Sequence, residues 1–344
     1  MDKNLKKFIS IQCGLKDNDL FKNNRKWIAN FTKDDQNEGF VQLRNELKKI
    51  NILINTDDFY NHQQEPDLEI HFVKTYKKKY NCKQYLLLPE SIEIIKENNI
   101  NLLKKFYDKI FCQFDDFIDN KKVFKLYYPY DLNIQKEIIK FKDKKFACIL
   151  TSNKNLKSYA SNNLYPLRYK LIKWFEKNHK ERLHCYGLDW HLPMKKTGYL
   201  GRALNFLNRL GLHKIYYKAP KNYYGLVDSK IQTLKNYKFT FCFENCSING
   251  YISDPIFDAI NARSVPIYFG AKNINMYIPE DCFINFSKFK SFDNLYSYLN
   301  DIDTDRYEKY LKSAYNFYNS IKSNVFKKEY FVSSLIKNIK SDLS

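Results

Sequence analysis

Short apolar runs, separated by longer stretches with helical periodicity, constrain the fold of this 344-residue chain more than any other feature. Each run is long enough for one buried strand. Repetition of strand, helix and strand predicts parallel sheets covered by helices, which is an α/β fold. The runs are Phe8–Gln12, Ile50–Asn55, Glu69–Val73, Tyr85–Leu88, Ile110–Phe114, Val123–Tyr128, Phe146–Thr151, Leu183–Tyr186, Phe239–Phe243, Val265–Phe269 and Phe283–Phe286.

The charged and weakly apolar stretch 131–145 divides these runs into two groups. We therefore expect two Rossmann-like domains that face a cleft, with ligands at the carboxyl ends of the strands. The predicted domains are residues 1–135 and 145–302, and residues 303–344 are predicted to form C-terminal helices. Apolar residues at steps of three and four also predict helices over Gly39–Lys49, Leu167–Lys177 and Asp228–Tyr237.

Composition narrows the class of protein. Hydrophobic residues make up 44% of the chain, which is enough for a sizeable core and excludes global disorder. No apolar run approaches the roughly 20 residues of a membrane helix, and the first thirty residues contain no apolar segment typical of a secretory signal. The formal charge of +20 favours polyanionic partners, namely nucleic acid, an anionic membrane or a phosphorylated substrate.

The cysteine, histidine and aspartate residues do not occur at the sequence spacings that are typical of metal ligands. None of the eight cysteines forms a C-x-x-C pair, so we expect buried free thiols in a reducing cytosol. None of the six histidines pairs at such a spacing. Two D-x-D sequences, Asp17–Asp19 and Asp301–Asp303, lie in polar surroundings without a preceding strand, and we predict solvated loops there. The sequence therefore predicts no metal site.

The stretch 237–286 carries the strongest chemical signal. A predicted strand ends at Glu244 and Asn245, and Ser253-Asp254-Pro255 then opens an apolar run. Ser or Asp before Pro is typical of a helix N-terminus. The free amides and the positive dipole end of such a helix favour a phosphate group.

Several ordered blocks in this stretch resemble the signature of the α-1,3-fucosyltransferases, glycosyltransferase family 10, of the soluble bacterial or viral type. The blocks are Tyr237–Phe239, Phe243–Asn245, Gly250–Ala259, Ser264–Ala271, Tyr277–Pro279 and Phe283–Ile284. Upstream blocks agree in order, and they are Leu86–Ser91, Leu126–Tyr130, Ala147–Asn153, Arg168 and His184–Gly187. A chance match to all of them in order is improbable.

The resemblance implies a GT-B fold, in which the N-terminal domain binds an acceptor and the C-terminal domain binds GDP-fucose. It further implies inversion at the anomeric carbon, with no required cofactor and no essential metal. By position, Glu90 matches the general base and Arg168 a pyrophosphate-binding arginine. The other predicted donor-binding residues are Asn245 and Tyr251 at the nucleotide sugar, Asp254 at the sugar itself, and their neighbours Ser152, Asn153, Glu244 and Ser253.

One departure from the family concerns the helix start. The family has Thr-Glu-Lys where this chain has Ser253-Asp254-Pro255, so the lysine that would pair with the diphosphate is missing. Lys272 and Lys154 are candidate replacements, and we include Lys272 among the donor-binding residues. A different GDP-activated sugar, such as a deoxy-heptose or another deoxy-hexose, is the alternative explanation.

The sequence thus predicts an inverting transferase that moves fucose to a hydroxyl of an N-acetylglucosamine-containing glycan in an α-1,3-type linkage. A lipid-linked cell-surface polysaccharide at the cytoplasmic face of the membrane is the expected acceptor. Residues 326–344 are predicted to be either a basic amphipathic helix at that membrane or an ordinary docked helix. A basic nucleic-acid-binding protein is the outside alternative, but lysines spread along the chain and no nucleic-acid-binding motif is present.

Overall fold

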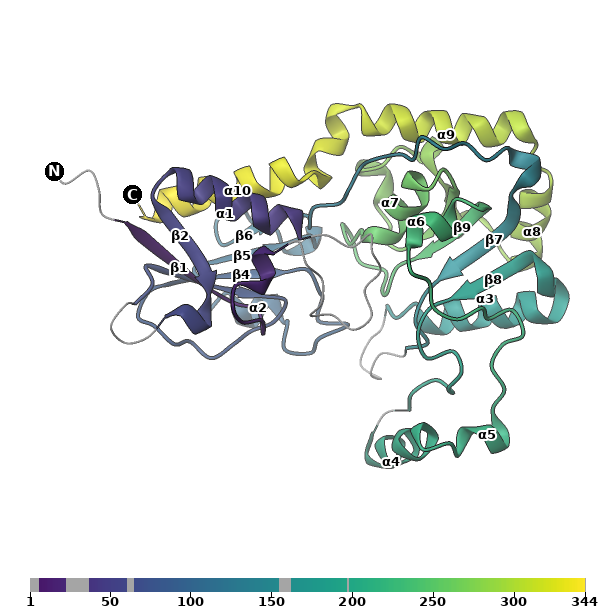
Figure 1. The fold of residues 1–344 in the computed structure, drawn as a ribbon, viewed down its shortest axis with the longest axis horizontal. Helices are drawn as coiled ribbons and strands as arrows, with labels where there is room; N and C mark the ends of the chain where they lie inside the picture. The colour runs from purple at the N-terminus through teal and green to yellow at the C-terminus, as the bar shows by residue number, and fades with distance from the viewer. Residues whose placement is uncertain (1–5, 23–36, 61–64, 155–161, 197, 344) are drawn as a thin grey trace. The chain divides into compact units, whose positions relative to one another are not determined.

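The computed structural model describes residues 6–22, 37–60, 65–154, 162–196 and 198–343 (Figure 1). The chain splits into two compact units. The first contains the described residues up to 131 together with those from 323 onward. The second contains the described residues between 132 and 322.

The first unit is built on a six-stranded sheet with the order β2-β1-β3-β4-β5-β6. Every neighbouring pair is parallel. The chain order reverses between β1 and β3, and such a switch point is where open α/β sheets bind ligands. The strands are β1 (Lys7–Gln12), β2 (Ile52–Thr56), β3 (Leu68–Phe72), β4 (Lys83–Leu88), β5 (Lys109–Cys112) and β6 (Val123–Lys125).

Two helices distant in sequence share the core of the first unit. Figure 1 shows α1 (Glu38–Lys49) beside α10 (Lys328–Leu343). The ring of Phe40 lies 4.9 Å from that of Phe72 on β3 and 5.4 Å from that of Phe331 on α10, measured between centroids. The short helix α2 (Ile100–Leu103) precedes β5.

The apolar residues of α10 belong to this core. Four of them are at most 4% exposed, and they are Phe331, Val332, Leu335 and Ile339. Side chains buried in this way are not available to a membrane in the folded chain, so α10 is a docked helix rather than an amphipathic surface helix.

The second unit repeats the strand order of the first on a five-stranded parallel sheet, β11-β10-β9-β7-β8. Read along the chain, the first strand, β7, again lies between the second and the third. The switch point is therefore between β7 and β9. The strands are β7 (Lys145–Leu150), β8 (Leu183–Tyr186), β9 (Tyr237–Phe243), β10 (Val265–Phe269) and β11 (Ile284–Asn285).

Three helices of the second unit, α3, α6 and α8, bury apolar residues against this sheet. Phe175 on α3 packs with Phe241 of β9, and Leu295 on α8 belongs to the same cluster. Ile231 on α6 packs with Cys148 and Tyr237 in a separate cluster. The helices are α3 (Tyr165–Asn178), α4 (Gly198–Arg209), α5 (His213–Tyr216), α6 (Lys230–Leu234), α7 (Asp254–Asn261), α8 (Phe292–Asn300) and α9 (Thr304–Tyr318).

The α/β fold with parallel sheets is confirmed, and each of the predicted apolar runs contains a strand. The helix predicted over 228–237 is shorter, because Tyr237 already begins β9 and only Lys230–Leu234 is helical. Helix α4 was not predicted. All eight cysteines are free thiols. Among the described residues, no helix is long and apolar enough to span a bilayer, and no three metal-ligating side chains gather.

Candidate functional site

Polar side chains meet at the switch point of the second sheet. Thr151 directly follows β7, and Glu244 and Asn245 directly follow β9. Because β7 and β9 are parallel neighbours, their carboxyl ends lie at the same edge of the sheet. This edge holds most of the donor-binding residues that the sequence predicts.

Arg168 joins the two strand ends. Its Nη1 donates to Thr151 Oγ1 at 3.0 Å, and its Nη2 donates to the carbonyl oxygen of Phe243 and to Asn245 Oδ1 at 3.2 Å. The side chain lies on the first turn of α3, which Pro166 opens, and the residue is only 7% exposed. Burial lowers the pKa of the guanidinium, but an arginine starts so high that it stays cationic.

The Arg168 guanidinium has one donor that the described residues do not satisfy. This donor is the buried Nε, which makes no hydrogen bond among them. The guanidinium carbon lies 4.7 Å from the ring centroid of Tyr165, which supports the cation without neutralising it. The site therefore presents a fixed positive charge, as recognition of phosphate requires.

Asn245 and Tyr251 extend the same hydrogen-bond network. Asn245 Nδ2 donates to the Tyr251 hydroxyl at 3.3 Å, while its Oδ1 accepts from Arg168. Tyr251 is only 2% exposed. The structure thus brings Arg168, Asn245 and Tyr251 together, although they come from separate parts of the sequence.

Glu244 is a buried carboxyl group beside this network, with 1% of its surface exposed. The backbone N–H of Ser253 donates to Glu244 Oε1 at 2.8 Å, and the Ser253 hydroxyl donates to Oε2. Ser253 precedes α7, but its side chain binds Glu244 instead of capping the helix. A Cβ at Gly270 would lie 2.2 Å from Glu244 Cγ, so glycine is required opposite the carboxyl group.

Burial raises the pKa of the Glu244 carboxyl from 4.5 to about 7, against the lowering effect of the Ser253 hydrogen bonds. Between these values the folded protein holds a proton that the unfolded chain releases. The free energy of unfolding should therefore fall as the pH rises through this window, by up to about 1.4 kcal/mol per pH unit.

Urea unfolding between pH 4.5 and 7.5 measures this contribution. We expect Glu244→Gln, which cannot ionise, to have a flatter pH dependence of the free energy of unfolding than the wild type. Parallel curves for the two proteins would contradict the raised pKa.

A lysine that sequence reasoning missed lies at the start of α7. Lys230 Nζ is 2.7 Å from Asp254 Oδ2 and 3.3 Å from Asp258 Oδ2. Its side chain is 13% exposed. Lys230 lies on α6, far from Asp254 in sequence, and no motif links the two residues. The ammonium group is thus near the position at which Pro255 replaces the lysine expected from the family pattern.

Three other predicted donor-binding residues lie outside this network. Asn153 is 2% exposed, and its Nδ2 donates to the carbonyl oxygens of Leu192 at 2.7 Å and Asp189 at 3.3 Å. Its side-chain amide therefore holds a loop. Ser152 is half-buried after β7, and Lys272 is exposed after Gly270. Among the described residues, no hydrogen bond or ion pair joins the Lys272 ammonium to the Arg168 network.

Glu90 lies in the first unit, half-buried just after β4. Asn98 Nδ2 donates to the carbonyl oxygen of Glu90 at 2.8 Å and to that of Val73 at 3.2 Å. Val73 follows β3 with a φ of 74°, a left-handed conformation that is rare for a β-branched residue. Asn98, which the sequence did not single out, therefore fixes the backbone of Glu90 to the end of the neighbouring strand.

Comparison with known proteins finds similarity to one family over the C-terminal part of the chain. Residues 209–341 match the model of "Glycosyltransferase family 10 (fucosyltransferase) C-term". The chain is 36% identical over 72 residues to an α-(1,4)-fucosyltransferase of Arabidopsis thaliana. It is 34% identical over 89 residues to the α-(1,3)-fucosyltransferase FucT of Helicobacter pylori. These matches cover 21% and 26% of this chain, and only 18% of the length of each relative.

Solved structures extend the likeness to the whole fold. An α1,3-fucosyltransferase crystallised with GDP has a TM-score of 0.52 and 17% identity, and the match covers 95% of both chains. An α-glucosyltransferase in complex with UDP and DNA has a TM-score of 0.55 and 11% identity, over 97% of this chain and 99% of that one. These neighbours have the GT-B fold. Residues 209–341 of this chain thus resemble the C-terminal part of the glycosyltransferase family 10 enzymes.

Proposed function

We propose that this protein is an inverting glycosyltransferase that moves fucose from GDP-fucose to a hydroxyl group of a glycan acceptor. The observation that carries the proposal is the buried Arg168, held by Thr151 and Asn245 at the switch point of the second sheet. The match of residues 209–341 to the fucosyltransferase family model supports a fucosyl donor. In this proposal the second unit binds the donor and the first binds the acceptor.

The donor is bound through its diphosphate and its sugar. The Arg168 guanidinium and the backbone amides at the start of α7 bind the negatively charged diphosphate. Asn245 and Tyr251 line the nucleotide sugar, and Asp254, with Ser253, contacts the transferred sugar. In place of the lysine that is missing from the start of α7, we favour Lys230 over Lys272, because Lys230 forms an ion pair with Asp254 there.

The transfer needs a base and a stabilised leaving group. The Glu90 carboxylate takes the proton of the acceptor hydroxyl as its oxygen attacks the anomeric carbon. The bond from that carbon to the phosphate oxygen breaks on the opposite face, so the configuration inverts and GDP leaves. Arg168 stabilises the negative charge that develops on the diphosphate. No cofactor beyond the donor takes part in this proposal.

The sequence of the α7 start favours one alternative donor class. Asp254 is one methylene shorter than the family's glutamate, and Pro255 replaces its lysine. Another GDP-activated sugar, a deoxy-heptose or a deoxy-hexose, therefore competes with GDP-fucose. For the acceptor we propose an N-acetylglucosamine-containing polysaccharide, lipid-linked at the cytoplasmic face of the membrane, with an α-1,3-type linkage.

A thermal-unfolding panel tests the donor. We expect GDP to raise the free energy of unfolding by about 2.7 kcal/mol at one hundred times its dissociation constant. UDP, CMP and ADP at equal concentration serve as controls and should have smaller effects. GDP-fucose and other GDP-sugars are then ranked by the same shift. Stabilisation by UDP alone, or by no nucleotide, would refute the proposal.

A further inference from the structure

Helix α4 exposes the face that a helix of a globular protein normally buries. Leu200 and Tyr199 are each 89% exposed, and Phe206 is 62% exposed. At 100° per residue these side chains lie on one face together with Ala203, Leu207 and Leu210. An apolar stripe of this size, turned outward, indicates a surface that binds an apolar partner.

The opposite, polar face of α4 is already held by the protein. Asn205 exchanges two hydrogen bonds with the backbone of Lys196, at 3.0 and 2.8 Å. Asn208 is 5% exposed, and its Oδ1 accepts from the Tyr216 hydroxyl at 2.6 Å. Its carbonyl oxygen bonds to His213 Nδ1, also at 2.6 Å. These contacts join α4 to α5 and to Lys196, so they occupy its polar face and leave the apolar stripe exposed.

The apolar surface continues through α5. Leu210 is 70% exposed and Ile215 is 82% exposed, and Tyr216 exposes 56% of its surface. We use the term basic arm for residues 198–218, which include both helices (Figure 1).

The charge around the basic arm has one sign. The 38 residues from Trp190 to Val227 contain no Asp or Glu. The same stretch contains seven basic side chains, which are Lys195, Lys196, Arg202, Arg209, Lys214, Lys218 and Lys221. Lys195 is paired with Asp189 at 3.1 Å, so six of these side chains remain as the charge around the arm. Apolar and aromatic residues among such cations are typical of segments that lie in the interface of an anionic membrane.

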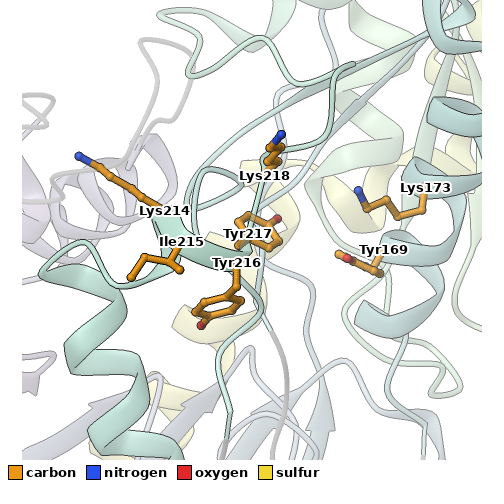
Figure 2. A pocket seen from close by; sticks show the side chains of 7 residues that line it. All are labelled: Tyr169, Lys173, Lys214, Ile215, Tyr216, Tyr217 and Lys218. Carbon is orange, nitrogen blue, oxygen red and sulfur yellow. The ribbon is translucent and has the colours of Figure 1, made fainter.

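A cationic pocket lies between the arm and α3. Figure 2 shows the segment from Lys214 to Lys218 across from Tyr169 and Lys173 of α3. The cavity has a volume of about 380 Å³, and three lysines and three tyrosines contribute to its lining. Lys173 is paired with Glu176 at 2.6 Å, which leaves Lys214 and Lys218 as the cations that extend the charge of the arm. Ammonium groups at this position can form ion pairs with the phosphate groups of lipids.

We propose that the basic arm inserts its apolar stripe into the interface of a membrane containing anionic phospholipid. A nucleic acid would match the cations but not the exposed Leu200 and Ile215, because its backbone offers phosphates and no apolar layer. The other apolar helix proposed for a membrane, α10, is buried in the first unit. The proposal does not depend on the sugar donor.

Vesicle flotation of the full chain tests the proposal. The vesicles are pure phosphatidylcholine or phosphatidylcholine with phosphatidylglycerol. We expect binding to the anionic vesicles, weakened by salt, and little binding to the neutral ones. The double variant Leu200→Glu, Ile215→Glu should bind anionic vesicles at least about tenfold more weakly than the wild type. Because both side chains are exposed, the variant should keep the thermal unfolding midpoint of the wild type.

The matched control is Met276→Glu, Ile321→Glu. These side chains are 71% and 84% exposed and lie outside the arm, and the double variant changes the charge by the same amount. We expect it to lose at most about half as much binding free energy as the arm variant, since it removes charge without removing the stripe. Equal loss in both variants, or no binding to either vesicle, would overturn the proposal. So would an arm-dependent dimer in solution without lipid, or arm-dependent binding to an oligonucleotide alone.

Discussion

Glu90→Gln is expected to lower kcat for sugar transfer by about 10²–10⁴-fold while leaving the affinity for GDP unchanged. The amide has nearly the shape of the carboxyl group but cannot take a proton from the acceptor hydroxyl. Asn98 binds the backbone carbonyl of Glu90, not its side chain, so this contact survives the substitution. Steady-state transfer from GDP-fucose gives kcat, and calorimetric titration gives the GDP affinity.

Glu97→Gln is the control for this variant. Glu97 is exposed and seven positions further along the chain, so the same chemical change is made away from the strand ends. We expect it to retain the activity of the wild type. Transfer by Glu90→Gln within a few-fold of the wild-type rate would remove Glu90 from the role of base, even if GDP binding supports the rest of the proposal.

The second large effect is expected for Arg168→Ala, which should weaken GDP binding by about 10- to 150-fold, the range for loss of a hydrogen bond to a charged group. The same substitution leaves Thr151 Oγ1, Asn245 Oδ1 and the Phe243 carbonyl without their buried donor. We therefore also expect the free energy of unfolding to fall by about 1–3 kcal/mol. Calorimetric titration with GDP, at a temperature where the variant is folded, measures the first effect.

Arg168→Lys separates charge from geometry. Lysine keeps the positive charge but cannot reach three acceptors from one planar group. We expect a GDP affinity between those of the wild type and Arg168→Ala. Arg306→Ala, which removes an exposed arginine on α9, should leave GDP binding unchanged. A wild-type GDP affinity in Arg168→Ala would exclude the arginine from the donor site.

The sequence alone was sufficient to predict the strands but not all of the helices. A buried parallel strand is apolar on both faces, so runs such as Val265–Phe269 are visible without any tertiary information. Helix α4 has equally clear spacing from Tyr199 to Leu210. Its apolar face, however, is exposed to solvent, whereas a helix in a globular protein usually buries this face. Periodicity alone would therefore have placed these residues in the core.

The site was predictable only where a local pattern exists. Asn245 and Tyr251 fall in two blocks of the family signature, and the structure brings them to Arg168. Lys230 and Asn98 lie in no such block. Each acts through contacts across two elements, Lys230 from α6 to α7 and Asn98 to the ends of β3 and β4. Contacts of this kind arise from folding and leave no local spacing to detect.

The return of α10 to the first unit has a consequence for synthesis on the ribosome. The core around Phe40 needs Phe331 and Leu335, which are translated almost three hundred residues later. The second unit, in contrast, has all of its strands available once Asn285 has left the exit tunnel. The first unit therefore completes its core only after the second unit has been translated, and we expect it not to finish folding first, as an N-terminal unit usually does. Until α10 is translated, the apolar residues that pack against it lack that cover, so we expect the nascent first sheet to be the part of the chain most exposed to aggregation.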